Sequence, residues 1–153
     1  MLWHSFPVKI WREADGASVE PMSGPSVVTI GNFDGVHRGH RHVLARALGL
    51  AGVLGKNGPL PVVAVTFDPH PLEIIAPDHA PLRLSTLDRR LALLREAGAD
   101  RVYVLAFSKE MSALTPDEFV KLVLLDPLPP PARWPGENCT FGPSAPRTQP
   151  RPR

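Results

Sequence analysis

The sequence predicts an α/β domain in which helices cover a parallel sheet. Short apolar runs rich in β-branched residues alternate with segments of helical periodicity, and two of these runs end at turns that carry glycine, proline and polar residues. Because strands and helices alternate, we expect right-handed crossovers and parallel pairing. A chain of 153 residues has the size of a single domain.

Three strands and three helices are expected in the first 125 residues. The strands are expected at 27–30, 61–67 and 101–107, and the helices at 37–51, at 85–98 and directly after Thr115. Ser85 is expected to cap the second helix and Gly98 to end it. Thr115 and Glu118 form a predicted capping box around Pro116. Residues 1–26 are expected to add an edge strand.

The last 28 residues differ from the rest in composition. They contain nine of the 19 prolines, and they carry the whole excess of positive charge, because residues 1–125 have 13 Lys+Arg and 13 Asp+Glu. We therefore expect a domain over 1–125 and a disordered Pro/Arg-rich tail over 126–153 that supplies no strand. The neutral body argues against nucleic acid as a partner.

Cysteine usage and hydropathy restrict the compartment. Cys139 is the only cysteine, so neither an intrachain disulfide nor a zinc site of paired cysteines is possible. No run of 18 apolar residues occurs, and the N-terminus lacks the apolar core of a signal peptide. The sequence predicts a cytoplasmic protein without a membrane partner, and it indicates no oligomeric state.

The candidate site is the segment that joins the first strand to its helix. It reads Gly-Asn-Phe-Asp-Gly-Val-His-Arg-Gly-His over residues 31–40. Glycines allow close approach of a ligand, and the helix start adds free N–H groups and a positive dipole end. His37 and His40 are expected to share one helical face and to donate to phosphate oxygens. The segment predicts a site for a triphosphate.

Two assignments in this segment stay open. Asp34 is either a direct or water-mediated magnesium ligand or the cap of a local Asx turn. The histidines have two alternatives, as satisfied polar residues at a helix start or as a zinc site with His42 and His70. Zinc is disfavoured because His37, His40 and His42 do not share one face. No metal site built from protein ligands is predicted.

The ten-residue segment resembles the signature of bacterial FAD synthetase, the FMN adenylyltransferase half of the bifunctional riboflavin kinase/FAD synthetase. The resemblance implies a Rossmann-like nucleotidyltransferase of the His-x-Gly-His superfamily that makes FAD and pyrophosphate from FMN and ATP with Mg²⁺. It implies His37 and His40 as catalytic residues. The implied ATP-binding residues are Gly31, Asn32, Phe33, Asp34, Gly35, Gly39 and His40.

A second segment, Thr66-Phe-Asp-Pro-His-Pro71, resembles a landmark of the same family that lies near the flavin. The resemblance implies flavin binding by Phe67, Asp68, Pro69, His70 and Pro71. A double-proline turn with an aromatic residue can offer a flat wall to a ring system. The alternative is a strand-ending turn with Phe67 in the core.

A third segment, Gly-Glu-Asn-Cys-Thr-Phe-Gly over 136–142, resembles a landmark that positions the flavin ligand, which implies Asn138 as a contact. Cys139 replaces an aromatic residue there, and Pro135 cannot donate a ladder hydrogen bond. The family continues with a Ser-Ser-Thr-x-x-Arg type segment and a riboflavin kinase barrel, and neither is present in these 153 residues. We expect a domain incomplete at its C-terminus, as in a truncated or frame-disrupted product. The alternatives are a catalytically impaired nucleotide- or flavin-binding fragment and a related nucleotidyltransferase with another acceptor.

Overall fold

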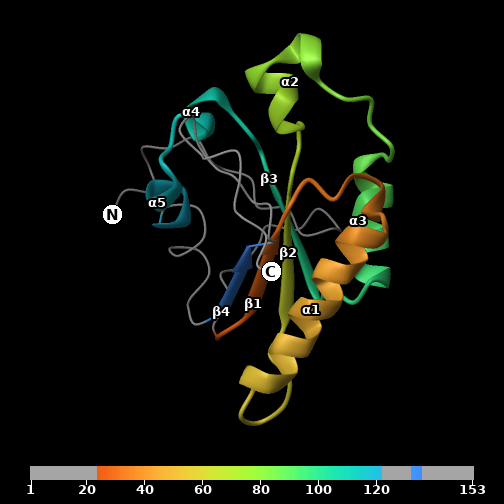
Figure 1. Cartoon of the computed structure of the whole chain (residues 1–153), viewed down its shortest axis with the longest axis vertical. Helices are drawn as coiled ribbons and strands as arrows, with labels where there is room; N and C mark the ends of the chain where they lie inside the picture. The colour runs from red at the N-terminus through yellow and green to blue at the C-terminus, as the bar shows by residue number, and fades with distance from the viewer. Residues whose placement is uncertain (1–23, 122–131, 136–153) are drawn as a thin grey trace, which may run out of the picture.

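The computed structural model describes residues 24–121 and 132–135, which form a four-stranded parallel sheet flanked by helices (Figure 1). The strands are β1 (Val27–Ile30), β2 (Val62–Phe67), β3 (Arg101–Leu105) and β4 (Ala132–Pro135). Their order in the sheet is β3-β2-β1-β4, and every neighbouring pair is parallel. The predicted α/β fold with a parallel sheet is confirmed.

Helices cover both faces of the sheet. On one face lie α1 (Arg38–Leu54) and α3 (Leu87–Glu96), and on the other lie α4 (Lys109–Ser112) and α5 (Pro116–Phe119) (Figure 1). Leu44 and Leu94 pack against the first face, whereas Met111 and Phe119 pack against the second. All residues of β1 and β2 are consequently buried, which explains their apolar and β-branched composition.

The first helix is longer than its pattern predicts. The expected helix ends at residue 51, before Gly52, whereas Gly52 lies inside α1 and the chain leaves the helix at Gly55. An isolated glycine lowers helix stability without preventing the helix, so it is a weak stop signal. The predicted stop at Gly98 is confirmed, since Gly98 follows the C-cap Ala97 of α3 and has a φ of +103°.

The expected cap of α3 at Ser85 is wrong. The N-cap is Thr86, whose side chain accepts a hydrogen bond from the backbone N–H of Arg89, while Ser85 is engaged by Asp34. The capping box before α5 is confirmed in both directions, with Pro116 at the first helical position.

The expectation that the tail supplies no strand is wrong for four residues. Residues 132–135 pair in parallel with β1, from Val27 opposite Ala132 to Ile30 opposite Pro135. Proline occupies only the last of these positions, and β4 lies at the edge of the described sheet, where a missing donor is tolerated. The expected edge strand within 1–26 and the rest of the tail lie outside the described residues, apart from the short stretch before β1.

The strand order determines where a ligand can bind. β2 and β3 lie on one side of β1, and β4 lies on the other, so the order reverses at β1. In open parallel sheets, ligands bind outside the carboxyl ends of the strands at such a reversal. Both candidate segments, after Ile30 and after Phe67, begin at these ends. Within the described ranges, no helix has the length and apolar character needed to cross a membrane.

Candidate active site

The loop after β1 is held in an unusual backbone conformation by burial. Phe33 and Val36 have positive φ values of 51° and 42°, and the side chain of each is 1 % exposed in the core beneath α1. Gly35, between them, has a φ of 70°. Non-glycine residues in the left-handed region cost energy and persist only where their surroundings fix them. The loop is therefore a defined platform between β1 and α1.

His37 caps α1 with its own ring. Its Nδ1 accepts hydrogen bonds from the backbone N–H groups of Gly39, at 3.1 Å, and of His40, at 3.4 Å. In the neutral ring the proton must then reside on Nε2, at the opposite edge of an exposed side chain. The expectation that these N–H groups are free for a ligand is wrong, because the imidazole occupies them. The helix end can reach an anion through His37 instead.

The expected shared face of the two histidines is confirmed. The rings of His37 and His40 stack with centroids 3.7 Å apart and an interplanar angle of 18°, and the edge of Phe33 approaches His40 with centroids 5.2 Å apart. Burial, and then the neighbouring His37, lower the pKa of His40 to about 4. His40 is consequently neutral at pH 7, and an arriving phosphate would favour its charged form.

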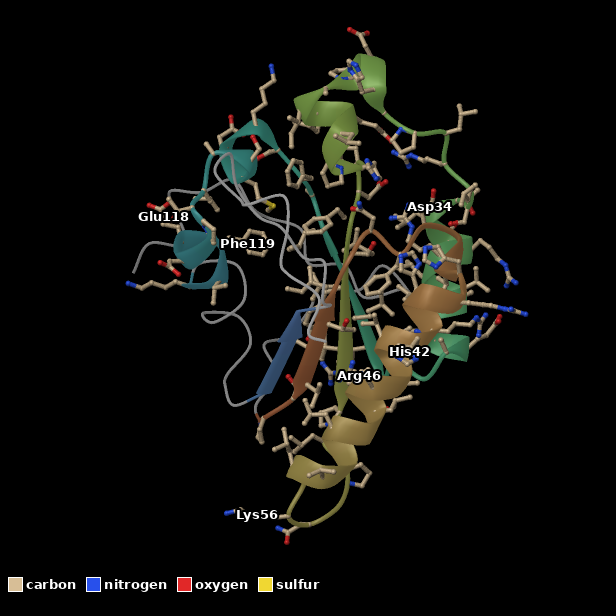
Figure 2. All side chains as sticks on the ribbon, in the orientation of Figure 1. Asp34, His42, Arg46, Lys56, Glu118 and Phe119 are labelled. Atoms are coloured by element: carbon tan, nitrogen blue, oxygen red, sulfur yellow. The ribbon has the colours of Figure 1, made fainter. Side chains whose placement is uncertain are left out.

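Asp34 connects this loop to the start of α3 (Figure 2). Its carboxylate accepts hydrogen bonds from the backbone N–H of Leu84 at 2.8 Å, from that of Ser85 at 2.9 Å, and from Ser85 Oγ at 2.8 Å. Burial opposes the charged form, but these hydrogen bonds outweigh it and lower the pKa of Asp34. The alternative of a local Asx turn is wrong, since the N–H groups that donate to Asp34 belong to residues about fifty positions further along the chain. Both oxygens already have protein partners, which favours a structural role.

The turn after β2 presents its prolines and histidine rather than its phenylalanine. Phe67 is 5 % exposed, lies in the core cluster below α4 and α5, and packs edge-on against Phe107. This placement fits the packing alternative. His70 caps α2 (Pro71–Ile75), its Nδ1 accepting from the N–H of Leu72 at 3.1 Å. Pro69, His70 and Pro71 are half-buried at the carboxyl end of β2.

Sequence reasoning missed an arginine that braces this turn. Arg83 donates through Nε and Nη2 to the two carboxylate oxygens of Glu73, at 2.7 and 2.9 Å, and through Nη1 to Asp68 at 2.9 Å. The hydrogen bond to Glu73 contributes most to raising the pKa of Arg83 above its usual value. The contacts tie the segment before α3 to the turn and to α2. No local pattern connects three charged residues so far apart.

A second missed residue is Arg90, whose side chain is 2 % exposed. It lies on the face of α3 that also carries Leu87, Leu91 and Leu94. Its Nη1 donates to Thr66 Oγ1 at 3.2 Å and to the carbonyl oxygen of Phe67 at 2.9 Å. An arginine within the apolar stripe of a helix was the signal that could have identified it, because buried charges need partners.

Other candidate residues are not brought to this site. His42 is exposed further along α1 (Figure 2), and Asn138 lies outside the described residues. Among residues 24–121, no three His, Cys, Asp or Glu side chains lie close enough together to hold a metal ion. The site therefore consists of the two motif loops and the first turn of α3.

A model of the FAD synthetase family matches residues 19–148. The chain belongs to this family. It is 40 % identical over 135 residues to the bifunctional riboflavin kinase/FMN adenylyltransferase of Escherichia coli strain K12, covering 88 % of this chain and 42 % of that protein. The enzyme of the same name from Pseudomonas fluorescens is 41 % identical over 125 residues, covering 82 % of this chain and 39 % of the relative.

The chain thus spans about two fifths of the length of these curated relatives. A solved structure described as a macrolide-efflux protein from Streptococcus pneumoniae is also similar, with a TM-score of 0.69 and 26 % identity. The similarity covers 89 % of this chain and 44 % of that one. This likeness supports the Rossmann-like arrangement of the sheet and helices.

Proposed function

We propose that this chain transfers the adenylyl group of ATP to FMN, giving FAD and pyrophosphate. The observation that carries the proposal is the stacked pair of His37 and His40 at the carboxyl end of β1, where the strand order reverses. Membership of the FAD synthetase family supports ATP and FMN as the substrates. With these substrates, we propose the cytoplasm as the compartment.

In the proposed reaction, a phosphate oxygen of FMN attacks the α-phosphorus of ATP. A new P–O bond forms, the bond from the α-phosphorus to the bridging oxygen breaks, and the electron pair leaves with pyrophosphate. The transition state gathers negative charge on the α-phosphoryl oxygens. His37, donating from Nε2, and the neighbouring His40 would stabilise this charge without forming a covalent bond.

Magnesium fits this proposal as a companion of ATP rather than as a resident of the protein. The described part of the chain offers no group of three ligands, and the oxygens of Asp34 accept hydrogen bonds from Leu84 and Ser85. Mg²⁺ commonly keeps several waters and binds through substrate phosphates. When bound, the ion would neutralise phosphate charge and polarise the α-phosphoryl group.

We assign the acceptor side to the turn after β2. This turn lies next to the loop after β1, residues 31–37, because β1 and β2 are neighbours in the sheet. Its half-buried residues Pro69, His70 and Pro71 offer a rigid surface to a ring system. Phe67 would support this surface from below, through its packing against Phe107. Asp68 stays on the acceptor side through its bond to Arg83, and Asn138 remains a proposed flavin contact.

Flavin fluorescence, followed during titration of the chain with FMN in the presence of ATP and Mg²⁺, tests the acceptor. Saturable binding of FMN together with formation of FAD supports the proposal. If FMN does not bind while another phosphate acceptor is adenylylated, the chain is a related nucleotidyltransferase. If FMN and ATP bind and no FAD forms, the chain is a binding fragment.

A further inference from the structure

Arg90 is a buried cation between the two motif loops. Its side chain is 2 % exposed, and none of the salt bridges in the described part of the chain includes it. Its Nε is also buried, without a hydrogen-bond partner among the described residues. A charge in such surroundings destabilises the fold unless it is compensated. The hydrogen bonds that Arg90 makes to Thr66 and Phe67 partly compensate this charge, so the groups that they join indicate what Arg90 does.

The hydrogen bonds of Arg90 connect the carboxyl ends of two strands. Nη1 donates to the carbonyl oxygen of Phe67, the last residue of β2, and to Thr66 Oγ1. The same hydroxyl donates to the carbonyl oxygen of Asn32 at 2.8 Å, in the loop after β1. The relay Arg90–Thr66–Asn32 therefore links the first turn of α3 to both loops.

The segment that leads into α3 contacts the same two loops. Ser85 is bonded to Asp34 and, through its hydroxyl oxygen, to the N–H of Gly35 at 3.0 Å. Arg83 is bonded to Asp68. These contacts lie at the surface or are half-buried, whereas those of Arg90 are buried. Arg90 is thus the buried member of a set of side chains whose hydrogen bonds reach both loops.

Resting on the proposed adenylyl transfer, we propose that Arg90 is a positioning residue that aligns the ATP loop (residues 31–37) with the acceptor turn (residues 67–71). In-line transfer requires the attacking oxygen and the α-phosphorus to meet in one geometry. A misplacement of about 1 Å can cost on the order of a hundredfold in rate, with little loss of affinity. Arg90 acts through the two loops and not by contact with either substrate.

The test compares three variants of the full chain: Arg90→Met, Arg90→Lys and Arg89→Met. Arg89 is the matched control, because it is the adjacent residue of α3 and its exposed side chain contacts Glu96. Arg90→Met should lower kcat by roughly ten- to a hundredfold, with KM for ATP and FMN changed by less than about threefold. Arg90→Lys, which keeps a charged donor, should recover most of kcat. The control should match the wild type.

Amide hydrogen exchange gives a readout that does not depend on turnover. If Arg90 positions the loops, Arg90→Met should speed exchange locally, at residues 31–37 and 68–72, and leave the centres of β1, β2 and β3 protected. Thr66→Val, which removes the relay hydroxyl, should loosen residues 31–37 in the same way. In the double variant the two effects on exchange should not add.

The outcomes separate this inference from the proposed function. If the wild-type chain makes no FAD, the proposed transfer is overturned. In that case hydrogen exchange is the only measurement that decides whether Arg90 positions the loops. Uniform loosening of the whole sheet, or a kcat and an exchange pattern unchanged from the wild type in Arg90→Met, overturns the positioning role. If Arg90→Met does not fold, Arg90→Lys and Thr66→Val decide the matter by the same criteria.

Discussion

The imidazole rings of His37 and His40 lie stacked, with centroids 3.7 Å apart, at the start of α1. One ring is exposed and caps the helix through Nδ1, while the other is partly buried and has a pKa of about 4. The low pKa of His40 keeps its ring neutral at pH 7 while it stacks on His37. We expect the two rings to donate hydrogen bonds to a phosphate, His37 through Nε2, while Nδ1 of His37 keeps its bond to the helix.

His40→Ala should depress turnover more than ATP affinity. If His40 acts mainly on charge that develops in the transition state, kcat should fall by roughly ten- to a thousandfold while the Kd of ATP changes little. Steady-state kinetics and calorimetric titration measure the two quantities. His42→Ala is the control, since His42 is an exposed residue of the same helix. Equal losses of affinity and turnover would make His40 a ground-state binder.

The stability of the chain should depend on pH through His40. Its pKa falls from 6.5 to about 4 on folding, so the unfolded chain binds more protons between these values. The stabilising contribution is complete above pH 6.5 and is lost as the pH falls toward 4. Urea denaturation gives the free energy of unfolding at each pH. This free energy should depend less steeply on pH in His40→Gln than in the wild type. Parallel curves would contradict the shifted pKa.

Asp34→Asn should destabilise the fold without changing the magnesium requirement. The amide keeps one acceptor oxygen, so part of the bonding to Leu84 and Ser85 is lost, at a cost on the order of 1–3 kcal/mol. Thermal denaturation measures the cost, and titration of ATP binding with Mg²⁺ measures the requirement. A variant of normal stability that needs much more Mg²⁺ would show that Asp34 is a metal ligand.

Gly35→Ala should lower the stability of the chain and its affinity for ATP, whereas Gly52→Ala should lower neither. Gly35 has a φ of 70°, and a Cβ there would lie 3.3 Å from Cβ of Leu84. The left-handed conformation costs a non-glycine residue about 1–2 kcal/mol, and the contact would push the ATP loop from the start of α3. A Cβ at Gly52, inside α1, meets nothing within 4 Å, so alanine should stabilise by roughly 0.5–1 kcal/mol. Denaturation and ATP titration compare the two variants.

Local pattern was sufficient to predict most of the sheet and the turn from β1 into α1. The β-branched runs of β1 and β2 identify buried parallel strands because both faces are covered, and the capping box at Thr115 involves only neighbouring residues. The likeness of residues 31–40 to a family signature identified this turn as the candidate site. His37 is the N-cap of α1 and His40 lies in its first turn, and their spacing of three residues brings the two rings together.

The features that the sequence did not predict depend on contacts between residues far apart in the chain. Ser85 has the chemistry of a cap, yet Asp34 engages it, and the next residue caps α3 instead. Arg90 lies in a leucine stripe, where its partners at the ends of β2 cannot be read from helical periodicity. β4 pairs with β1 through backbone groups, which composition did not reveal.

Transfer of label from ATP tests the central claim most directly. The chain is incubated with FMN, Mg²⁺ and ATP that carries ³²P at either the α- or the γ-phosphorus, and the products are separated. We expect α-label in FAD and γ-label in pyrophosphate, in equal amounts, with both reduced by His40→Ala. Label that stays in ATP while FMN and ATP both bind, or α-label that appears in a product other than FAD, would contradict FMN adenylyl transfer by this chain.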